Sequence, residues 1–160
     1  VVFGSPGWRS LAYRSPIVRT ARSGWLGVDR IFDIGPGIPK APMPDGLRVE
    51  RLGVLPADAV SVLMAKARLG IAAYPRHVIG KSGILAAYHA HGLVCLNLTD
   101  RGTIHDDVFE GRHFAGLDTL RHVTFDEEAI AAAGHRWYHG HDRRATSALF
   151  AGMIREANPA

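Results

Sequence analysis

Short hydrophobic runs, separated by turns rich in glycine and proline, dominate the first hundred residues of the chain. The runs show little of the alternation expected of a strand with one wet face, which indicates strands covered on both sides, as in parallel sheets. The expected strands cover residues 1–3, 30–34, 47–54, 70–74, 93–98 and 120–125. Two polar stretches, residues 35–46 and 99–119, are expected to be loops.

Between these runs, hydrophobic residues recur at the period of a helix. The clearest case is Val60, Leu63, Met64 and Ala67, which stand at i, i+3, i+4 and i+7 after Pro56, a residue suited to a first helical turn. The other expected helices cover residues 8–26 with a break near Pro16, residues 81–91, and the stretch from Asp126 onward with interruptions near Gly134 and Gly140. The alternation predicts one Rossmann-like domain over residues 1–160, a three-layer α/β/α fold with a mainly parallel sheet.

Composition narrows the class of protein. No run approaches the ~20 apolar residues that a membrane-spanning helix needs, and the first residues lack the layout of a signal peptide. The single cysteine, Cys95, stands in an expected buried strand and has no intramolecular disulfide partner, so we expect a cytoplasmic protein. The net charge of +4 favours an anionic partner without distinguishing nucleotide from phosphate or nucleic acid.

The turn Gly80-Lys81-Ser82-Gly83 precedes the expected helix of residues 81–91. Exposed amides at a helix start, glycines that admit a phosphate, the Ser82 hydroxyl and the Lys81 charge together suit a diphosphate. The turn is not a Walker P-loop, because Pro75 stands where that motif has its first glycine. An alternative stays open: the glycines serve a tight turn, Ser82 caps the helix and Lys81 is solvated.

Two passages, VVFGSPGWR and LGVLPADAVSVLMAKARLGIAAYPRHVIGKSGILAAYHAHGLVCLN, extend the argument beyond local pattern. They resemble the C-terminal, donor-binding half of retaining GT-B glycosyltransferases of the glycogen-synthase-like type. AAYHAHGLVCL fills the slot of the small-residue helix and following strand of that family, and Gly92 matches its glycine. The helix with Trp137 and Tyr138 takes the place of the family's terminal helix.

The resemblance implies that the chain binds a nucleoside-diphosphate sugar as donor substrate, with no further cofactor and no bound metal. It also implies an N-terminal acceptor-binding domain, missing from this chain or supplied by a partner, and the cleft face left exposed could form a homodimer. Arg9 and Lys81 would stabilise the leaving diphosphate as the catalytic cations. The implied donor-binding residues are Gly4, Ser5, Gly7, Tyr74, His77, Ser82 and Gly83.

Three other interpretations remain. The family commonly has two glutamates where this chain has Ile79 and Ala87, which favours a degenerate, non-catalytic domain that binds a nucleotide or a partner. Asp33, at the end of an expected strand, suits a Rossmann dinucleotide binder, although GSPG is not G-x-G-x-x-G. Nucleic-acid binding by the arginines between Arg9 and Arg22 is less favoured, because no aromatic platform accompanies them.

Histidines near the end of the chain raise the question of a metal. His135 and His139 are four residues apart, a spacing that can place two ligands on one face of a helix. The sequence identifies no third ligand, and the glutamate of H-E-x-x-H is absent after His135. We therefore expect a surface or interface role for these histidines.

Overall fold

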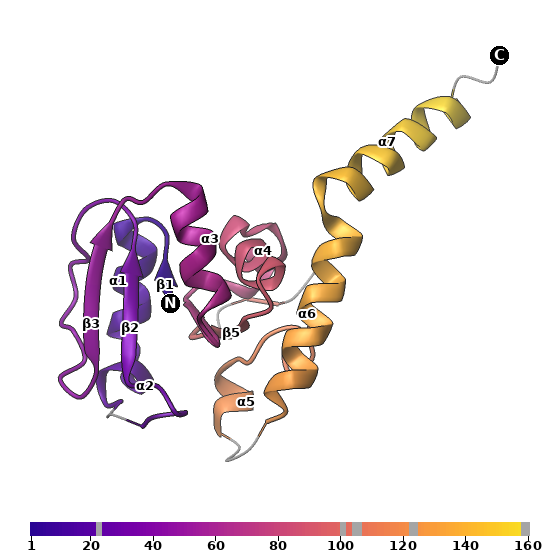
Figure 1. The fold of residues 1–160 in the computed structure, drawn as a ribbon. Helices are drawn as coiled ribbons and strands as arrows, with labels where there is room; N and C mark the ends of the chain where they lie inside the picture. The colour runs from indigo at the N-terminus through magenta and orange to yellow at the C-terminus, as the bar shows by residue number, and fades with distance from the viewer. Residues whose placement is uncertain (22–23, 100–101, 104–106, 122–124, 158–160) are drawn as a thin grey trace.

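The structure of the chain is a computed structural model that describes residues 1–21, 24–99, 102–103, 107–121 and 125–157. Within these ranges, one sheet of parallel strands has the order β3-β2-β1-β4-β5 (Figure 1). The strands are β1 (Val2–Phe3), β2 (Arg30–Ile34), β3 (Arg48–Gly53), β4 (Leu69–Ala72) and β5 (Val94–Asn97). Helices flank this sheet, which confirms the predicted Rossmann-like α/β fold.

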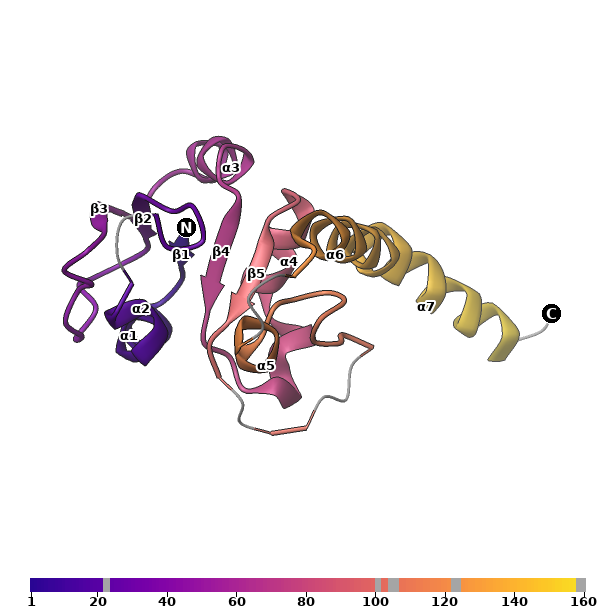
Figure 2. The same cartoon turned by 90° about the horizontal axis from the view of Figure 1, so that it is seen from below.

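The helices form two layers around the sheet and one extension from it. The view from below separates α3 and α4 on one face from α1, α2 and α5 on the other (Figure 2). The elements are α1 (Pro6–Arg14), α2 (Pro16–Arg19), α3 (Ala57–Ala65), the 3₁₀ helix η1 (Arg76–Lys81), α4 (Gly83–Ala90), α5 (Leu117–Arg121), α6 (Glu127–His141) and α7 (Arg143–Ala157). α6 packs against α4 and β5, and α7 continues away from the body of the molecule (Figures 1 and 2).

Two buried clusters, one on each face, hold the layers together. The first joins α1 to the sheet and includes Tyr13, Ile31 and Leu96. The second joins α3 and α4 to the opposite face and includes Met64 and Tyr88. β4 and β5 are buried along their whole length, which explains the uninterrupted apolar runs of their sequences.

The predicted helix breaks are partly correct. Pro16 ends α1 and starts α2 as its first residue, as expected of a residue without an amide hydrogen. The interruption expected near Gly134 is wrong, because α6 runs through this residue; the glycine is a contact point, and a Cβ there would lie 2.6 Å from Cδ2 of His89 on α4. The chain instead leaves α6 at Asp142, close to the second predicted break at Gly140.

The strand expected at residues 120–125 is wrong at its start. Leu120 lies in α5, and its amide donates to the carbonyl of Gly116 at 3.0 Å, as in a helix. Residues 122–124 of this prediction lie outside the described residues.

β3 lies at one end of the strand order and is only partly buried. Its outward positions carry charge: Arg48 and Glu50 of this strand form an ion pair, with Nε and Oε1 2.9 Å apart. Arg30 of β2 lies on the other side of Glu50, 3.6 Å from the same carboxylate oxygen.

Across the ranges that the structure describes, no helix has both the length and the apolar character needed to span a membrane.

Candidate functional site

The order of the strands reverses between β1 and β4, which are neighbours although far apart in sequence. Open parallel sheets bind ligands outside the carboxyl ends of the strands at such a point. The two segments that leave the sheet here are residues 4–9, which run from the end of β1 into the start of α1, and residues 73–83, which include η1 and reach the start of α4. We call these the first and second turns. They contain all nine residues that the sequence proposes for the site.

Gly4 allows the first turn to lie directly on α4. Its φ of +127° is rarely adopted by other residues, and a Cβ here would stand 2.4 Å from Cδ1 of Ile84. The amide of Gly4 donates to the carbonyl of Ile34 at 3.1 Å, so the turn is also fixed to the end of β2. The first turn is therefore held against the start of α4, which is where the second turn ends.

Ser82 ends the second turn as the N-cap of α4. Its hydroxyl oxygen accepts from the amides of Ile84 and Leu85 at 3.2 and 3.3 Å. The capping role left open by the sequence is thus present, and it occupies the hydroxyl. Lys81 immediately precedes the cap and is exposed, as is Gly83.

Tyr74 connects the two turns. The ring of Trp8, from the first turn, stacks on that of Tyr74 with centroids 4.3 Å apart and planes at 28°. Burial raises the pKa of Tyr74, and a hydrogen bond with the Ser82 side chain opposes that rise. Trp8, Tyr74 and Ser82 therefore form one continuous set of contacts across the switch point.

Asn97 fixes the backbone of Tyr74 from the end of β5. Its Oδ1 accepts from the Tyr74 amide at 2.9 Å, and its Nδ2 donates to the Tyr74 carbonyl at 3.0 Å. The sequence reasoning missed both Asn97 and Trp8. A signal for Asn97 was present, because it is the polar residue within the apolar run LVCLNL and is fully buried. A pocket of about 430 Å³ lies beside these contacts, lined by α1 residues and by Ala73, Pro75, Leu98 and Thr99.

Arg9 is turned into the protein. Its side chain is 2% exposed and forms an ion pair with the fully buried Asp33 at the end of β2. The guanidinium also donates to the carbonyls of Gly4 at 3.0 Å and Gly37 at 2.8 Å, and to that of Pro36. Arg9 therefore joins the first turn to the loop after β2, and the structure does not bring its charge together with that of Lys81 at the surface.

The same pair determines the environment of Asp33 and Tyr13. The Tyr13 hydroxyl lies beside Asp33, and its pKa is raised by burial and then by the charge of that carboxylate. Asp33, the candidate ribose ligand of a dinucleotide binder, is thus enclosed and neutralised by Arg9. This placement speaks against the dinucleotide interpretation.

The remaining predicted residues are exposed on the two turns. Ser5 and Gly7 are exposed in the first turn, and a Cβ on Gly7 would have nothing closer than the Ser5 hydroxyl at 4.0 Å. His77 is exposed in η1 and lies against the loop after β5, because a Cβ on Gly102 would stand 2.6 Å from its Nδ1.

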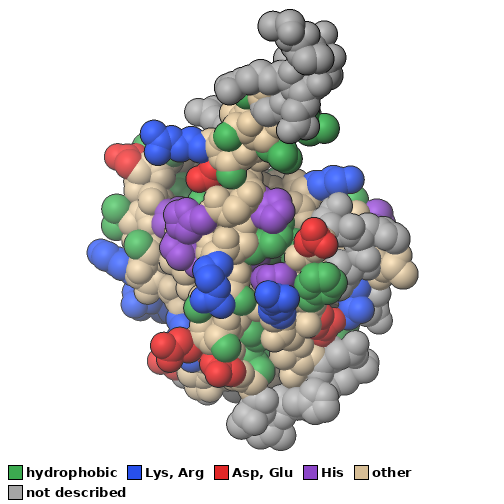
Figure 3. Space-filling model, turned by 90° about the vertical axis from the view of Figure 1, so that its right-hand side faces the viewer, with side chains coloured by type: hydrophobic (Ala, Val, Ile, Leu, Met, Phe, Trp, Pro, Cys, Tyr) green, Lys and Arg blue, Asp and Glu red, His purple; other side chains and the backbone are tan. Residues whose placement is uncertain are grey.

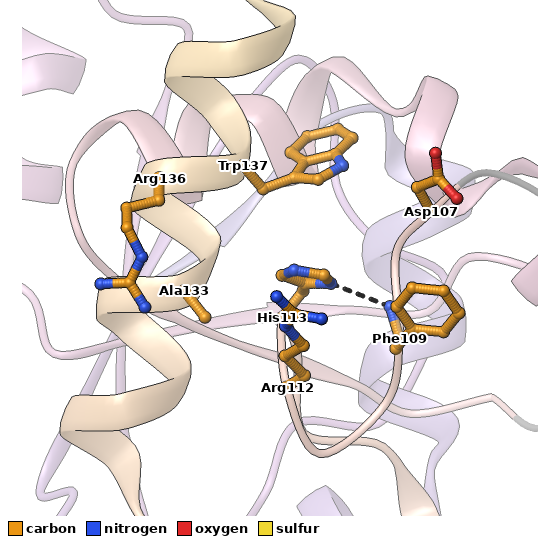
Figure 4. A pocket seen from close by; sticks show the side chains of 7 residues that line it. All are labelled: Asp107, Phe109, Arg112, His113, Ala133, Arg136 and Trp137. Atoms are coloured by element: carbon orange, nitrogen blue, oxygen red, sulfur yellow. Dashed lines mark hydrogen bonds between the residues drawn. The ribbon is translucent and has the colours of Figure 1, made fainter.

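Further hollows lie beside the helices, and one of them reaches the carboxyl ends of β1 and β2 at Phe3 and Ile34. An apolar groove of about 440 Å³ separates α3 from α4, and Ser61 and His91 bridge it with Oγ and Nε2 2.6 Å apart. A pocket of about 380 Å³ lies between α6 and residues 107–113 (Figure 4).

The pocket of about 380 Å³ is lined by two arginines, Arg112 and Arg136, and by one carboxylate, that of Asp107. Figure 4 shows Arg136 on α6 and Arg112 beside His113 on the facing loop. The Nδ1 of His113 accepts from the Phe109 amide at 3.0 Å. Burial, followed by the charge of Arg112, lowers the pKa of His113. Nothing in the local sequence pattern predicted this grouping.

Comparisons of the chain with protein-family models, with curated proteins and with solved structures find no match.

Proposed function

We propose that this chain is the donor-binding half of a glycosyltransferase and binds a nucleoside-diphosphate sugar across the first and second turns. The observation that carries the proposal is the adjacency of β1 and β4, which brings the GSPGW and GKSG segments to one edge of the sheet. The resemblance of the same two segments to the retaining GT-B family supports it. The fold is compatible with many other functions, so the proposal rests on the site.

Each side chain then has a separate task. Lys81 is the exposed cation that faces the diphosphate and stabilises the negative charge that grows on it as the sugar departs. Gly83 and the start of α4 add the partial positive charge of a helix N-terminus. Tyr74 and Trp8 offer an aromatic edge for the base or ribose.

Arg9 acts in this proposal as a positioning residue rather than as a ligand of the diphosphate. Its bonds to Asp33 and to the carbonyl of Gly4 set the shape of the first turn, which then meets α4. The acceptor would bind on a second domain that covers the switch point.

A titration by calorimetry tests the site. UDP, GDP, ADP and NAD are titrated into the chain and into Lys81→Ala, with Lys66→Ala as matched control. Lys66 is also exposed, but it is the C-cap residue of α3, outside the first and second turns. We expect one nucleoside diphosphate to bind, NAD to give no signal, and Lys81→Ala alone to weaken binding by about 10- to 100-fold, the range of a hydrogen bond to a charged group. Binding of NAD alone, or equal affinity in both variants, contradicts the proposal.

One observation favours a second candidate, a domain that binds a nucleotide without transferring a sugar. Ile79, at one family glutamate position, is 1% exposed and belongs to the core around Met64 and Tyr88. Ala87, at the other, lines the apolar groove. Release of the nucleoside diphosphate from a bound nucleotide sugar, with the sugar transferred to water or to an added acceptor hydroxyl, supports the donor domain, whereas binding without release supports this second candidate.

A further inference from the structure

Two histidines of α6, His135 and His139, face each other through their Nε2 atoms. His135 and His139 lie one helical turn apart, and their Nε2 atoms are 3.1 Å from one another. Their rings are perpendicular, with centroids 4.5 Å apart, and both side chains are exposed. Figure 3 views the molecule from the side where α6 lies, and histidine side chains are prominent on this face.

A backbone carbonyl fixes the tautomer of one of the two rings. The Nδ1 of His135 lies 2.9 Å from the carbonyl oxygen of His89, at the end of α4. A carbonyl oxygen only accepts, so Nδ1 of His135 carries the hydrogen and donates it. The Nε2 of neutral His135 therefore presents a lone pair, and the Nε2–H of His139 donates to it.

This arrangement matches the surroundings of histidines that bind metals. Such histidines usually donate their other ring N–H to a carbonyl or carboxylate, which orients the ring and makes the ligating nitrogen more basic. Two nitrogens bound to a tetrahedral Zn²⁺ at about 2.05 Å lie about 3.3 Å apart, close to the observed separation. The hydrogen bond from His135 to the His89 carbonyl thus orients the His135 ring and leaves its Nε2 free to bind a metal. The spacing of the two histidines in the sequence does not reveal this bond.

We propose that His135 and His139 bind one divalent transition cation of the Zn²⁺, Ni²⁺ or Cu²⁺ class through their Nε2 atoms. On binding, the proton on Nε2 of His139 moves through solvent to Nδ1 of the same ring, so both nitrogens offer lone pairs and no proton is lost. Imidazole suits these cations, whereas Mg²⁺ and Ca²⁺ prefer oxygen ligands. This inference does not depend on the proposed function at the switch point.

Water fills the other coordination positions. Among the residues that the structure describes, no third histidine, cysteine, aspartate or glutamate joins the pair. Structural zinc sites are closed by four protein ligands, so a pair with open positions holds its cation exchangeably. The site is therefore a surface site that responds to the concentration of the cation.

Calorimetric titration of the whole chain with ZnCl₂ and with NiCl₂ tests the site. We expect one cation per chain, reversal by EDTA, and no heat from MgCl₂. His139→Ala and His135→Ala should each weaken binding more than about tenfold, because losing a ligand costs at least as much as losing an outer partner of one. His141→Ala is the matched control: it lies on the same helix, but its Nδ1 bonds to the Trp137 carbonyl at 2.8 Å and its ring stacks on Trp137.

Two further measurements keep the outcome unambiguous. Far-ultraviolet circular dichroism checks that each variant is folded, and long-range ¹H–¹⁵N spectra report which ring nitrogens shift when Zn²⁺ is added. Shifts at Nε2 of His135 and His139 support the site. Equal affinity in all four proteins, shifts confined to other histidines, or no binding by the unmodified chain overturns it.

Discussion

Arg9 and Lys81 stand in similar sequence contexts and occupy opposite environments. Each is a cation that follows a glycine near the carboxyl edge of the sheet, Arg9 at the start of α1 and Lys81 at the end of η1. Arg9 is buried and fully engaged with Asp33 and three carbonyls, whereas Lys81 is exposed and has no ion pair within the described residues. The difference teaches that the residues of the neighbouring strand, rather than the glycine turn, decide whether such a cation is buried in an ion pair or left at the surface.

Asp33 is the reason for the difference. It is the penultimate residue of β2, which pairs directly with β1, so the first turn meets a carboxylate as it leaves the sheet. A guanidinium with several fixed donors can satisfy that carboxylate and three carbonyls at once, which an ammonium on a flexible stem does less well. The first turn is thus an internal brace, and the second turn retains a cation for an external ligand.

The largest expected effect is that of Arg9→Ala. Removing the guanidinium leaves Asp33 buried without its charge partner, and breaking a buried pair in this way costs about 3–5 kcal/mol of unfolding free energy. Urea denaturation followed by circular dichroism measures the loss. In the double variant Arg9→Met, Asp33→Leu, we expect most of that stability to return, because no charge remains buried. A loss below about 1 kcal/mol in the single variant would remove the distinction between the two cations.

Acid should destabilise the protein through His89, a buried residue of α4. Burial lowers the pKa of His89 to about 4, below the ordinary value of 6.5. The unfolded chain then binds the proton more readily than the folded chain between these two values. Neutral His89 makes its full contribution to the free energy of unfolding above pH 6.5. This contribution is lost as the pH falls toward 4, by roughly 3 kcal/mol in total.

Urea denaturation at pH 7 and pH 5 measures this loss. His89→Phe should flatten the pH dependence in that window, even if the variant is less stable at both pH values. An unchanged slope in His89→Phe would assign the acid sensitivity to other groups.

Ser82→Ala should have a smaller effect. The change removes the oxygen that accepts from two amides at the start of α4, and a lost N-cap costs about 1 kcal/mol. Ser82→Asp, which can still accept these bonds, should retain most of the stability. Thermal unfolding of both variants distinguishes a cap from a hydroxyl without a structural role, for which the two changes would be equivalent.

The smallest expected effect on stability is that of Lys81→Ala. The side chain is exposed, so the unfolding free energy should change by no more than about 0.5 kcal/mol. Urea denaturation of the variant beside Arg9→Ala gives the sharpest contrast between the two turns. A loss comparable to that of Arg9→Ala would mean that Lys81 is also a structural brace.

The sequence predicted β4 and β5 because burial on both faces leaves a direct trace in the order of residues. The runs at β4 and β5 are apolar throughout, and the structure buries every residue of both strands. Leu120 was misassigned because a few apolar residues before an acidic helix start fit a strand or a short helix equally well.

The contacts of the site were less accessible to sequence reasoning because they join distant segments. Arg9 and Asp33 are 24 residues apart, and Trp8 meets Tyr74 only because β1 and β4 are neighbours. Gly134 appeared to be a helix breaker, although its small size is what admits the His89 ring. In each case the pattern identified an unusual residue, and only its partner in space gave the residue a role.

The charged edge at β3 has a consequence for how the protein behaves at high concentration. An edge strand presents unpaired backbone groups to which a strand of another molecule can add. At this edge, an incoming strand would have to displace or bury Arg48 and Glu50, which already pair with each other. This edge of the sheet therefore resists pairing with a strand of another molecule.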